Sequence, residues 1–156
     1  MNVFMPSLIH LIYASTATEP FGNVQLTELL QQARATNEGL GLTGVLLHSD
    51  GNFFQVLEGE PAVVDRLYQK IILDKRHSRF TVIIREPIAR RSFPSWSMGF
   101  SSVSAEELAT VAGLNDFFGK RSCFVQLDAG RAKKLLAAFE EGRWRVAATP
   151  ALRQGA

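Results

Sequence analysis

The sequence predicts an α+β fold in which two helices cover one face of a five-stranded mixed sheet. Short apolar runs separated by turn residues indicate the strands. Two segments with apolar residues at three- and four-residue spacing indicate the helices. These segments alternate in the order β-α-β-β-α-β-β. The chain has 156 residues, of which 46% are hydrophobic and 21% charged, which suits one domain with a short helical appendix.

The first strand and the first helix come from the N-terminal quarter of the chain. Leu8 to Ala14 is a nearly continuous apolar run, typical of a strand that is buried on both faces. The apolar spacing predicts a helix over Val24 to Asn37, with Asn37 on its inward face. We expect Asn23 to cap this helix at its N-terminus and Gly39 to end it.

The next two strands form a hairpin around the dipeptide Asp50-Gly51, which supplies the positive φ angles of a type I′ turn. The strands are residues 43–49 and 52–58, and a two-residue loop pairs Leu46 with Gln55. The carboxamide of Gln55 then lies on an apolar face, where burial without a partner costs about 1–3 kcal/mol. Its neighbours on that face are Leu46, Phe53 and Leu57.

A second helix and two further strands complete the sheet. Pro61 at its first position begins the helix, which we expect to run to about Asp74. Its inward residues are Val64, Leu67, Tyr68 and Ile71. The last strands are Arg79 to Glu86 and Phe93 to Phe100. Alternation puts Trp96, Met98 and Phe100 on one face of the final strand. This order is that of a ferredoxin-like sandwich with one added strand.

Two C-terminal helices are predicted over Ser104 to Phe118 and Asp128 to Glu140, the first with a capping box of Ser104 and Glu107. Their apolar stripes need a partner, and the sheet face opposite the first two helices needs a cover. That open face carries Val45, Leu47, Phe54 and Val56. We therefore place the C-terminal helices over it.

The organisation expected is a domain over residues 7–101, a helical extension over 104–146 and a disordered tail over 147–156. The net charge is only +2, and the basic residues are scattered along the sequence, so no nucleic-acid partner is expected. No run approaches the roughly 18 apolar residues of a membrane span, and the N-terminus lacks the basic region of a signal peptide. These features favour a cytoplasmic protein without a membrane partner.

Five blocks of the sequence resemble the BLUF domain, a flavin-binding sensor of blue light. They are LIYAS (11–15), ARATNEGLGLTGVLL (33–47), FFQVLEGE (53–60), DKRHSRF (74–80) and WSMGF (96–100). They occur in the family's order and spacing, over about residues 7–101, and the C-terminal helices are similar in kind to those of short stand-alone BLUF proteins. The resemblance implies a blue-light photoreceptor with FAD as its cofactor and without a catalytic output module.

The resemblance also implies roles for individual residues. Tyr13 stands where the family has its redox-active tyrosine, and Gln55 where it has the switching glutamine that bonds both the tyrosine and the flavin. Asn37 matches the asparagine at the pyrimidine edge of the ring. Trp96 and Met98 match the tryptophan and methionine of the last strand. Residues expected to contact the flavin are Asn37, Leu46, Gln55, Lys70, Ile71, Asp74, Arg76 and His77; no metal site is expected.

The implied mechanism is a change of hydrogen bonding around Gln55. Excited flavin takes an electron and then a proton from Tyr13, recombination restores the redox state, and the amide of Gln55 ends rotated or tautomerised. An added bond to the flavin carbonyl red-shifts its spectrum. We expect the change to pass through Trp96 and Met98 to the C-terminal helices, and from there to a downstream signalling protein or a homo-oligomer interface.

Alternatives remain open from the residues alone. An RRM-like RNA-binding module is one, because Phe53 and Phe54 lie on a central strand, and a small-molecule regulatory or acylphosphatase-like domain is another. Taken singly, Tyr13 suits a core tyrosine, Asn37 a helix cap, and Lys70 with Asp74 a plain i,i+4 pair. A flavin smaller than FAD fits the same ring pocket. The sequence departs from the family pattern at three positions. Ala33 stands where serine is frequent, and Thr36 stands where histidine or asparagine is frequent. Lys70 stands where arginine is frequent.

Overall fold

The computed structural model describes residues 7–19, 22–111, 114 and 124–141. Its elements are β1 (Ile9–Ala17), α1 (Asn23–Leu40), β2 (Thr43–Ser49), β3 (Asn52–Gly59), α2 (Pro61–Ile71), β4 (His77–Pro87), β5 (Gly99–Ser102), α3 (Ala105–Leu108), the 3₁₀ turn η1 (Phe124–Gln126) and α5 (Ala129–Glu140). Within the described ranges, no helix has the length and apolar composition that crossing a membrane requires.

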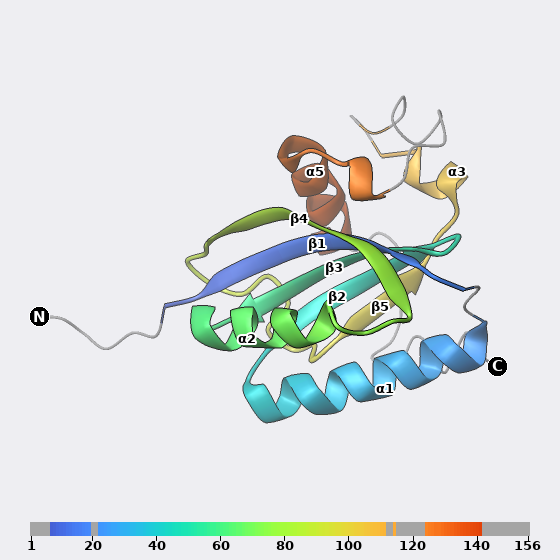
Figure 1. The fold of residues 1–156 in the computed structure, drawn as a ribbon. Helices are drawn as coiled ribbons and strands as arrows, with labels where there is room; N and C mark the ends of the chain where they lie inside the picture. The colour runs from blue at the N-terminus through green and yellow to red at the C-terminus, as the bar shows by residue number, and fades with distance from the viewer. Residues whose placement is uncertain (1–6, 20–21, 112–113, 115–123, 142–156) are drawn as a thin grey trace, which may run out of the picture.

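The sheet has five strands in the order β4-β1-β3-β2-β5. Strand β1 pairs antiparallel with β3 and with β4, β2 pairs antiparallel with β3, and β2 pairs parallel with β5. Helices α1 and α2 lie along one face, whereas α3 and α5 lie over the other (Figure 1). The predicted mixed sheet between two helical layers is therefore confirmed.

The hairpin between β2 and β3 has the predicted turn and register. Asp50 and Gly51 have φ angles of 49° and 78°, so both occupy the left-handed region that a type I′ turn requires. Leu46 lies opposite Gln55, as expected from a two-residue loop. This register fixes which face of the sheet carries the amide, because one residue of slip would turn Gln55 to the other side.

Helix α1 is longer at both ends than the pattern predicted. Its N-cap is Gly22, whose backbone N–H donates to the side chain of Gln25 at 2.9 Å, so the prediction that Asn23 is the cap is wrong. The helix ends at Leu40, and the residue that terminates it is the C-cap Gly41, with φ of 71°, and not Gly39. Gly41 is the position where the chain takes the left-handed conformation, which glycine adopts without steric cost.

The prediction of a strand over Phe93 to Phe100 is also wrong, because β5 begins only at Gly99. Among the described residues, the segment before it is not part of the pairing with β2, which starts at Gly99, and several of its carbonyl groups accept from other parts of the chain. Gly44 N–H donates to the carbonyl of Trp96 at 3.0 Å, and side chains of α1 donate to the next two carbonyls. Residues 92–98 therefore form an irregular segment, called here the 92–98 segment.

Smaller differences lie at other element ends. Strand β1 starts at Ile9 and continues to Ala17, β4 extends beyond the predicted range at both ends, and α2 stops at Ile71, before Asp74. Ser104 and Glu107 form the predicted capping box, with backbone-to-side-chain distances of 2.9 and 3.0 Å. Helix α3 covers only residues 105–108 of the predicted 104–118 helix, and the prediction is wrong for residues 109–111 and 114, which are described and not helical. Residues 112–113 and 115–118, like the predicted tail 147–156, lie outside the described residues.

Two separate apolar clusters lie on the two faces of the sheet. The cluster under α5 joins the predicted open face to the C-terminal elements and includes Val45, Leu47, Phe54, Val56, Phe124, Leu135 and Phe139. The cluster under α1 and α2 includes Leu11, Tyr13, Leu30, Leu46, Phe53, Leu57, Met98 and Phe100. The predicted placement of the C-terminal helices is confirmed for α5. We call the two sides the α5 face and the α1–α2 face.

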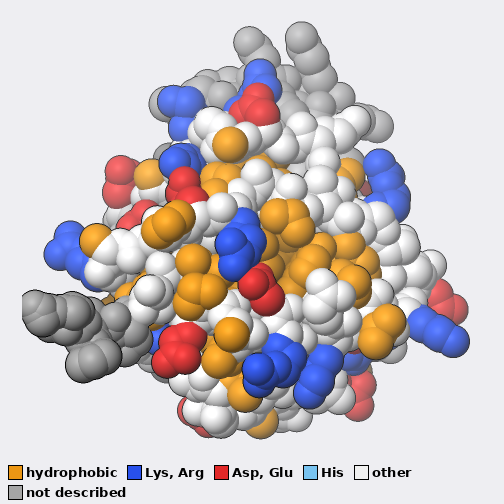
Figure 2. All heavy atoms as spheres, turned by 60° about the vertical axis from the view of Figure 1, so that its left-hand side comes forward, with side chains coloured by type: hydrophobic (Ala, Val, Ile, Leu, Met, Phe, Trp, Pro, Cys, Tyr) orange, Lys and Arg blue, Asp and Glu red, His pale blue; other side chains and the backbone are white. Residues whose placement is uncertain are grey.

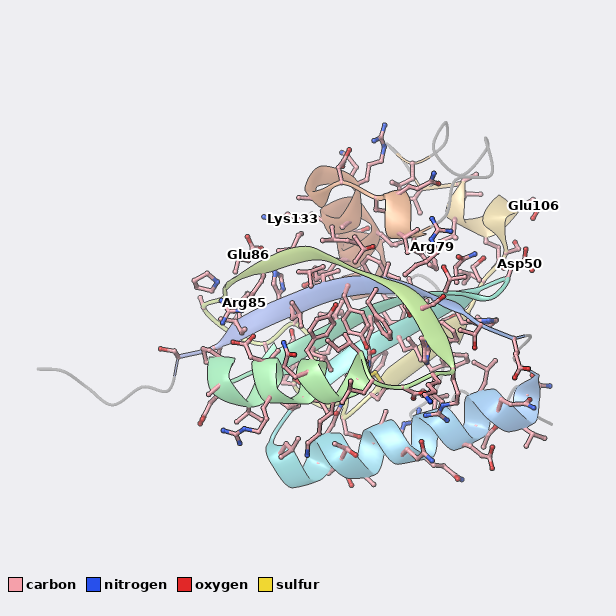
Figure 3. The ribbon with its side chains drawn as sticks, in the orientation of Figure 1. Asp50, Arg79, Arg85, Glu86, Glu106 and Lys133 are labelled. Atoms are coloured by element: carbon pink, nitrogen blue, oxygen red, sulfur yellow. The ribbon has the colours of Figure 1, made fainter. Side chains whose placement is uncertain are left out.

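Polar contacts also tie α5 to the sheet. Glu86 of β4 lies 3.3 Å from Lys133 of α5 and 2.8 Å from Nε2 of His10 on β1. Figure 3 shows Glu86 and Lys133 beside each other above the sheet. In the view of Figure 2, apolar side chains gather near the middle, with basic and acidic side chains among them.

Candidate functional site

A pocket lies between α1, α2 and the sheet, and it contains most of the residues that the sequence singled out. Its lining residues are Tyr13, Ser15, Leu29, Gln32, Ala33, Thr36, Asn37, Leu46, Phe53, Gln55, Leu67, Ile71, Asp74, Arg76 and His77. The two helices supply apolar walls, Leu29 and Ala33 from one and Leu67 and Ile71 from the other. The polar groups come from the sheet, from the loop after α2 and from α1, which contributes Gln32, Thr36 and Asn37.

Two neighbouring strands contact each other through side chains that line the pocket. Tyr13 on β1 and Gln55 on β3 lie directly opposite each other, and the Tyr13 hydroxyl donates to Oε1 of Gln55. The other end of the amide, Nε2, donates to the sulfur of Met98 at 3.7 Å. Gln55 therefore has a different partner at each end of its carboxamide, one a phenol and the other a thioether.

Burial reinforces the protonated state of Tyr13. Its side chain is 3% exposed, and desolvation raises the pKa of the phenol well above its usual value, with Tyr68 and Asp74 adding to the rise. The phenol therefore keeps its proton across the physiological pH range and acts as a donor. In the structure the hydroxyl donates to the Oε1 atom of Gln55, and the NH₂ group of the amide therefore faces Met98.

The loop after α2 closes one side of the pocket. Asp74 accepts from the guanidinium of Arg76 at 2.6 and 3.0 Å, and this bond lowers the pKa of the Asp74 carboxyl. Nδ1 of His77 lies 3.2 Å from the hydroxyl of Ser15, and burial lowers the pKa of the imidazole. The loop is attached to β1 through Thr18 N–H, which donates to the Arg76 carbonyl at 2.9 Å.

Asn37 is 1% exposed, and its Nδ2 donates to the carbonyl of Ser97 at 2.5 Å. Its side chain therefore points inward and does not cap the helix, which excludes the alternative interpretation of this residue as a cap. Lys70, in contrast, is exposed and is not among the pocket-lining residues, so the structure does not bring it to the site. Asp74 pairs with Arg76, and this is not the i,i+4 pair with Lys70 that the sequence left open.

The structure separates Trp96 from Met98, and the prediction that they share a face is wrong. Met98 is buried on the α1–α2 face beside Gln55. Trp96 packs on the α5 face, where its ring stacks on Phe93 at 6.0 Å and meets Phe139 of α5 edge-on at 5.9 Å. The irregular backbone causes the difference, because period-two alternation holds only in an extended strand.

Sequence reasoning missed several groups at or near the pocket. Ser15 and Gln32 line it, and the rings of His48 and His77 contact the ring of Phe53, whose position beside Gln55 was predicted, at 5.0 and 4.7 Å. Arg34 donates to the Met98 carbonyl at 3.0 Å. A polar residue in the run LIYAS could have indicated Ser15, but no sequence pattern places Arg34 against an irregular backbone.

The chemistry of the lining suits a flat heteroaromatic ring. Apolar side chains from two helices can cover the two faces of such a ring, while amide, imidazole and guanidinium groups meet a polar edge. The Tyr13 phenol and the Gln55 amide then lie in the floor of the slot. An arrangement of this kind can exchange an electron and a proton with a bound ring and record the event as an amide orientation.

Comparison with known proteins gives one family. The family model described as sensors of blue light using FAD matches residues 8–99. The beta subunit of the photoactivated adenylate cyclase of Euglena gracilis is 37% identical over 111 residues, which are 70% of this chain and 13% of that protein. The chain thus spans only a small part of this curated relative.

Three solved structures match over nearly the whole of their own length. The ground state of BlsA has a TM-score of 0.74 at 28% identity, covering 93% of this chain and 98% of that chain. The dark state of BlrB, titled a BLUF protein, has a TM-score of 0.66 at 30% identity, covering 86% of this chain and 99% of that chain. The photo-activated state of BlsA also matches, with a TM-score of 0.73 at 32% identity, covering 85% of this chain and 94% of that chain.

Proposed function

The chain belongs to the BLUF family, the sensors of blue light that use FAD, and we propose that it switches through the Tyr13–Gln55–Met98 contact at the floor of the α1–α2 pocket. The observation that carries the proposal is the amide of Gln55, whose two ends meet two chemically different partners. Reversal of that amide changes both contacts at once and needs little extra space.

The lining of the pocket supports the assignment of flavin-binding residues. Asn37, Gln55, Asp74, Arg76 and His77 surround its polar part, while Leu46 and Ile71 belong to the apolar lining. FAD supplies blue-light absorption and, when excited, a strong oxidising centre. Leu29 and Leu67 exclude water from the ring faces, and the Asp74–Arg76 ion pair holds the loop that closes the site. Lys70 stays a prediction for parts of the cofactor outside the pocket.

Tyr13 acts as a reversible donor in this proposal. Its phenol gives up one electron and then its hydroxyl proton, and both return to it, so the protein ends with no net oxidation. Burial keeps the hydroxyl protonated beforehand and keeps bulk water from competing for the proton. What persists is a changed pattern of donor and acceptor groups at the Gln55 side chain, produced by rotation of the amide or by its tautomerisation.

The same reversal removes a contact on the far side of Gln55. In the described arrangement Nε2 donates to the Met98 sulfur, and this bond requires an N–H at that end of the amide. Loss of the bond frees Met98 within the 92–98 segment, whose Trp96 ring lies against Phe139 of α5. We infer that the signal leaves the pocket through this segment and reaches α5, and that output is non-catalytic, through a partner protein or a second copy of the chain.

The RNA-binding alternative does not suit this site. Phe53 and Phe54 are each 1% exposed and point to opposite faces of the sheet, so neither offers a surface on which a base could stack.

The direct test is absorption spectroscopy of the purified flavoprotein. Blue light should shift the flavin absorption reversibly to longer wavelength in wild type. Tyr13→Phe should bind FAD and lose this product, while Tyr68→Phe, which changes the neighbouring ring 5.0 Å away, should retain it. A normal photocycle in Tyr13→Phe would refute the role of the phenol.

A second experiment tests the route to α5. Met98→Ala should leave FAD bound and reduce the light-dependent change in hydrogen exchange of residues 129–140. If α5 in this variant responds to light as it does in wild type, the signal travels by another path.

A further inference from the structure

Two side chains of α1 hold two successive carbonyl groups of the 92–98 segment. Asn37 donates to Ser97 O, and Arg34, three residues earlier and thus on the same helical face, donates from Nε to Met98 O at 3.0 Å. Asn37 also lines the pocket, whereas Arg34 does not. Arg34 therefore lies outside the pocket lining and contacts the Tyr13–Gln55–Met98 group through the Met98 backbone.

The environment of Arg34 is unusual for a surface-helix arginine. The side chain is half-buried, burial lowers its pKa, and within the described residues its Nη2 is buried without a hydrogen-bond partner. Its recorded bond is to a neutral backbone carbonyl and not to a carboxylate. A buried donor without a partner opposes stability, so packing alone gives no reason for a guanidinium at this position.

The Met98 carbonyl and the Met98 side chain belong to one residue, so a bond that holds the carbonyl restricts where the side chain can lie. The Met98 sulfur accepts from Nε2 of Gln55 at 3.7 Å. Met98 therefore contacts Arg34 with its backbone carbonyl and Gln55 with its side chain. A charge-assisted bond to a carbonyl is stronger than a neutral one, which suits a fixed attachment beside a group that moves.

The other end of the same segment has an independent attachment. Glu58 of β3 is fully buried, and its carboxylate accepts from Ser92 N–H at 2.6 Å and from Phe93 N–H at 3.1 Å. The segment is thus held by a sheet residue at its beginning and by helix α1 at its end. Only the end near Met98 adjoins Gln55.

We propose that Arg34 is a positioning residue of the switch: its bond to the Met98 carbonyl keeps the Met98 sulfur at the amide end of Gln55 and so favours return to the described, dark arrangement. The inference rests on the proposed function, since it assigns Arg34 to the same Gln55–Met98 contact. It adds that α1 controls the 92–98 segment as well as forming a wall of the pocket.

The test compares Arg34→Met, Arg34→Lys and a matched control, Arg66→Met, in the FAD-bound protein. Met keeps much of the apolar stem and removes every donor, and Lys keeps the charge and one donor group. Arg66 is an exposed arginine on α2, the other helix beside the pocket. The three readouts are FAD content, dark-state amide exchange over residues 96–100 and the rate of dark recovery after blue light.

For Arg34→Met we expect unchanged FAD content, dark exchange over residues 96–100 that is faster by about tenfold, and recovery slower by several-fold, since the return path loses a bond that guides Met98. Arg34→Lys should lie between Met and wild type, and Arg66→Met should match wild type. Equal exchange and recovery in Arg34→Met and Arg66→Met would overturn the proposal, and so would a Lys variant no closer to wild type than the Met variant.

The dark exchange measurement needs no photochemistry, so it separates the two proposals. A wild-type protein that shows no red shift refutes the switching function, while faster exchange in Arg34→Met still supports the attachment at Met98. If Arg34→Met does not fold, Arg34→Lys decides by the same two measurements: exchange and recovery identical to wild type in that variant overturn the role of the guanidinium.

Discussion

The two faces of the sheet differ in how their apolar side chains are covered. On the α5 face, buried residues of the sheet pack directly against α5 and η1, as in the contact of Phe54 with Phe124 at 5.7 Å. On the α1–α2 face, the helices stand apart around a pocket, and several of the apolar side chains on its walls are only partly buried. One sheet thus has a close-packed side and a hollow side.

This difference indicates which face of the sheet mainly stabilises the fold and which face can bind a ligand. A filled core resists change, because a shift of one side chain disturbs its neighbours. A face with a pocket can accept a ligand. The 92–98 segment contacts both faces, with Trp96 on one and Met98 on the other. It is therefore the part of the molecule that can transmit a change from the hollow side to the packed side.

The largest expected effect is a loss of unfolding free energy caused by a substitution on the packed side, the α5 face. Leu135 of α5 is fully buried, so Leu135→Ala should lower the free energy of unfolding by about 2–5 kcal/mol through lost burial and a cavity. Leu67→Ala, at the half-buried wall of the pocket, should cost the flavin-free protein about 1 kcal/mol and weaken FAD binding instead.

Urea unfolding of both flavin-free variants measures this contrast, and Lys134→Ala, exposed beside Leu135, is the control. Equal destabilisation by Leu135→Ala and Leu67→Ala would mean that the two faces do not differ in the way described here.

The next effect concerns the fixed end of the 92–98 segment. Glu58→Gln replaces one acceptor oxygen by an NH₂ group, so one of the amides of Ser92 and Phe93 loses its partner. We expect a loss of about 1–3 kcal/mol in unfolding free energy. Glu60→Gln, exposed at the start of α2, is the matched control. Stability equal to that of the control would show that the Glu58 carboxylate is not what fixes the start of the segment.

A third change fills the hollow side. Ala33→Leu adds a branched side chain to the wall of the slot and should reduce FAD occupancy by about tenfold or more, while the flavin-free protein loses little stability. Ala35→Leu, exposed on the same helix, should bind FAD normally. Flavin absorbance after reconstitution measures both variants, and full occupancy in Ala33→Leu would place the ring elsewhere.

Sequence reasoning predicted the parts of this fold that repeat a regular period. The hairpin register, and with it the position of Gln55 opposite Leu46, followed from one Asp-Gly dipeptide. The packing of α5 on the open face followed from two apolar patterns that each needed a partner. The contact between Tyr13 and Gln55 was implied by the resemblance to the BLUF domain, and the pairing of β1 with β3 brings the two residues together.

The errors lie where the backbone is irregular. Alternation from Trp96 to Phe100 suggested a strand, but contacts that are distant in sequence, from Asn37 and Arg34, hold the carbonyls of this segment instead. The same contacts send Trp96 and Met98 to opposite faces. The spacing of residues along the sequence does not show which distant side chain will donate to a given carbonyl group. The arrangement of this part of the site could therefore be seen only in the structure.

The smallest expected effect sharpens the comparison through pH. Two imidazoles on the α1–α2 side, His48 and His77, flank the ring of Phe53, and burial lowers the pKa of both. Asp50 opposes this fall at His48 and Asp74 opposes it at His77, where Arg76 adds to it. Nε2 of His48 accepts from Gly51 N–H at 3.2 Å, which a protonated ring cannot do.

The sign follows from the direction of these shifts. Above the ordinary histidine pKa of about 6.5, both rings are neutral in the folded and unfolded chain and add no pH dependence. As the pH falls through that value, the unfolded chain binds protons more readily than the folded one, so stability decreases until the lowered folded pKa values are passed. Between about pH 7.5 and 5.5 we expect a loss of less than about 1 kcal/mol, since His77 is partly exposed and solvent screens its charge.

Urea unfolding at pH 7.5 and 5.5 measures the loss in wild type, in His48→Asn and in His77→Gln. Each substitution removes one group that gains a proton on unfolding, so each should reduce the difference between the two pH values. His77→Gln should also make FAD binding less dependent on pH, because His77 lines the pocket, whereas His48→Asn should not. A pH difference that both variants leave unchanged would mean that acid acts on other groups, and the hollow face would then not be the acid-sensitive side of the sheet.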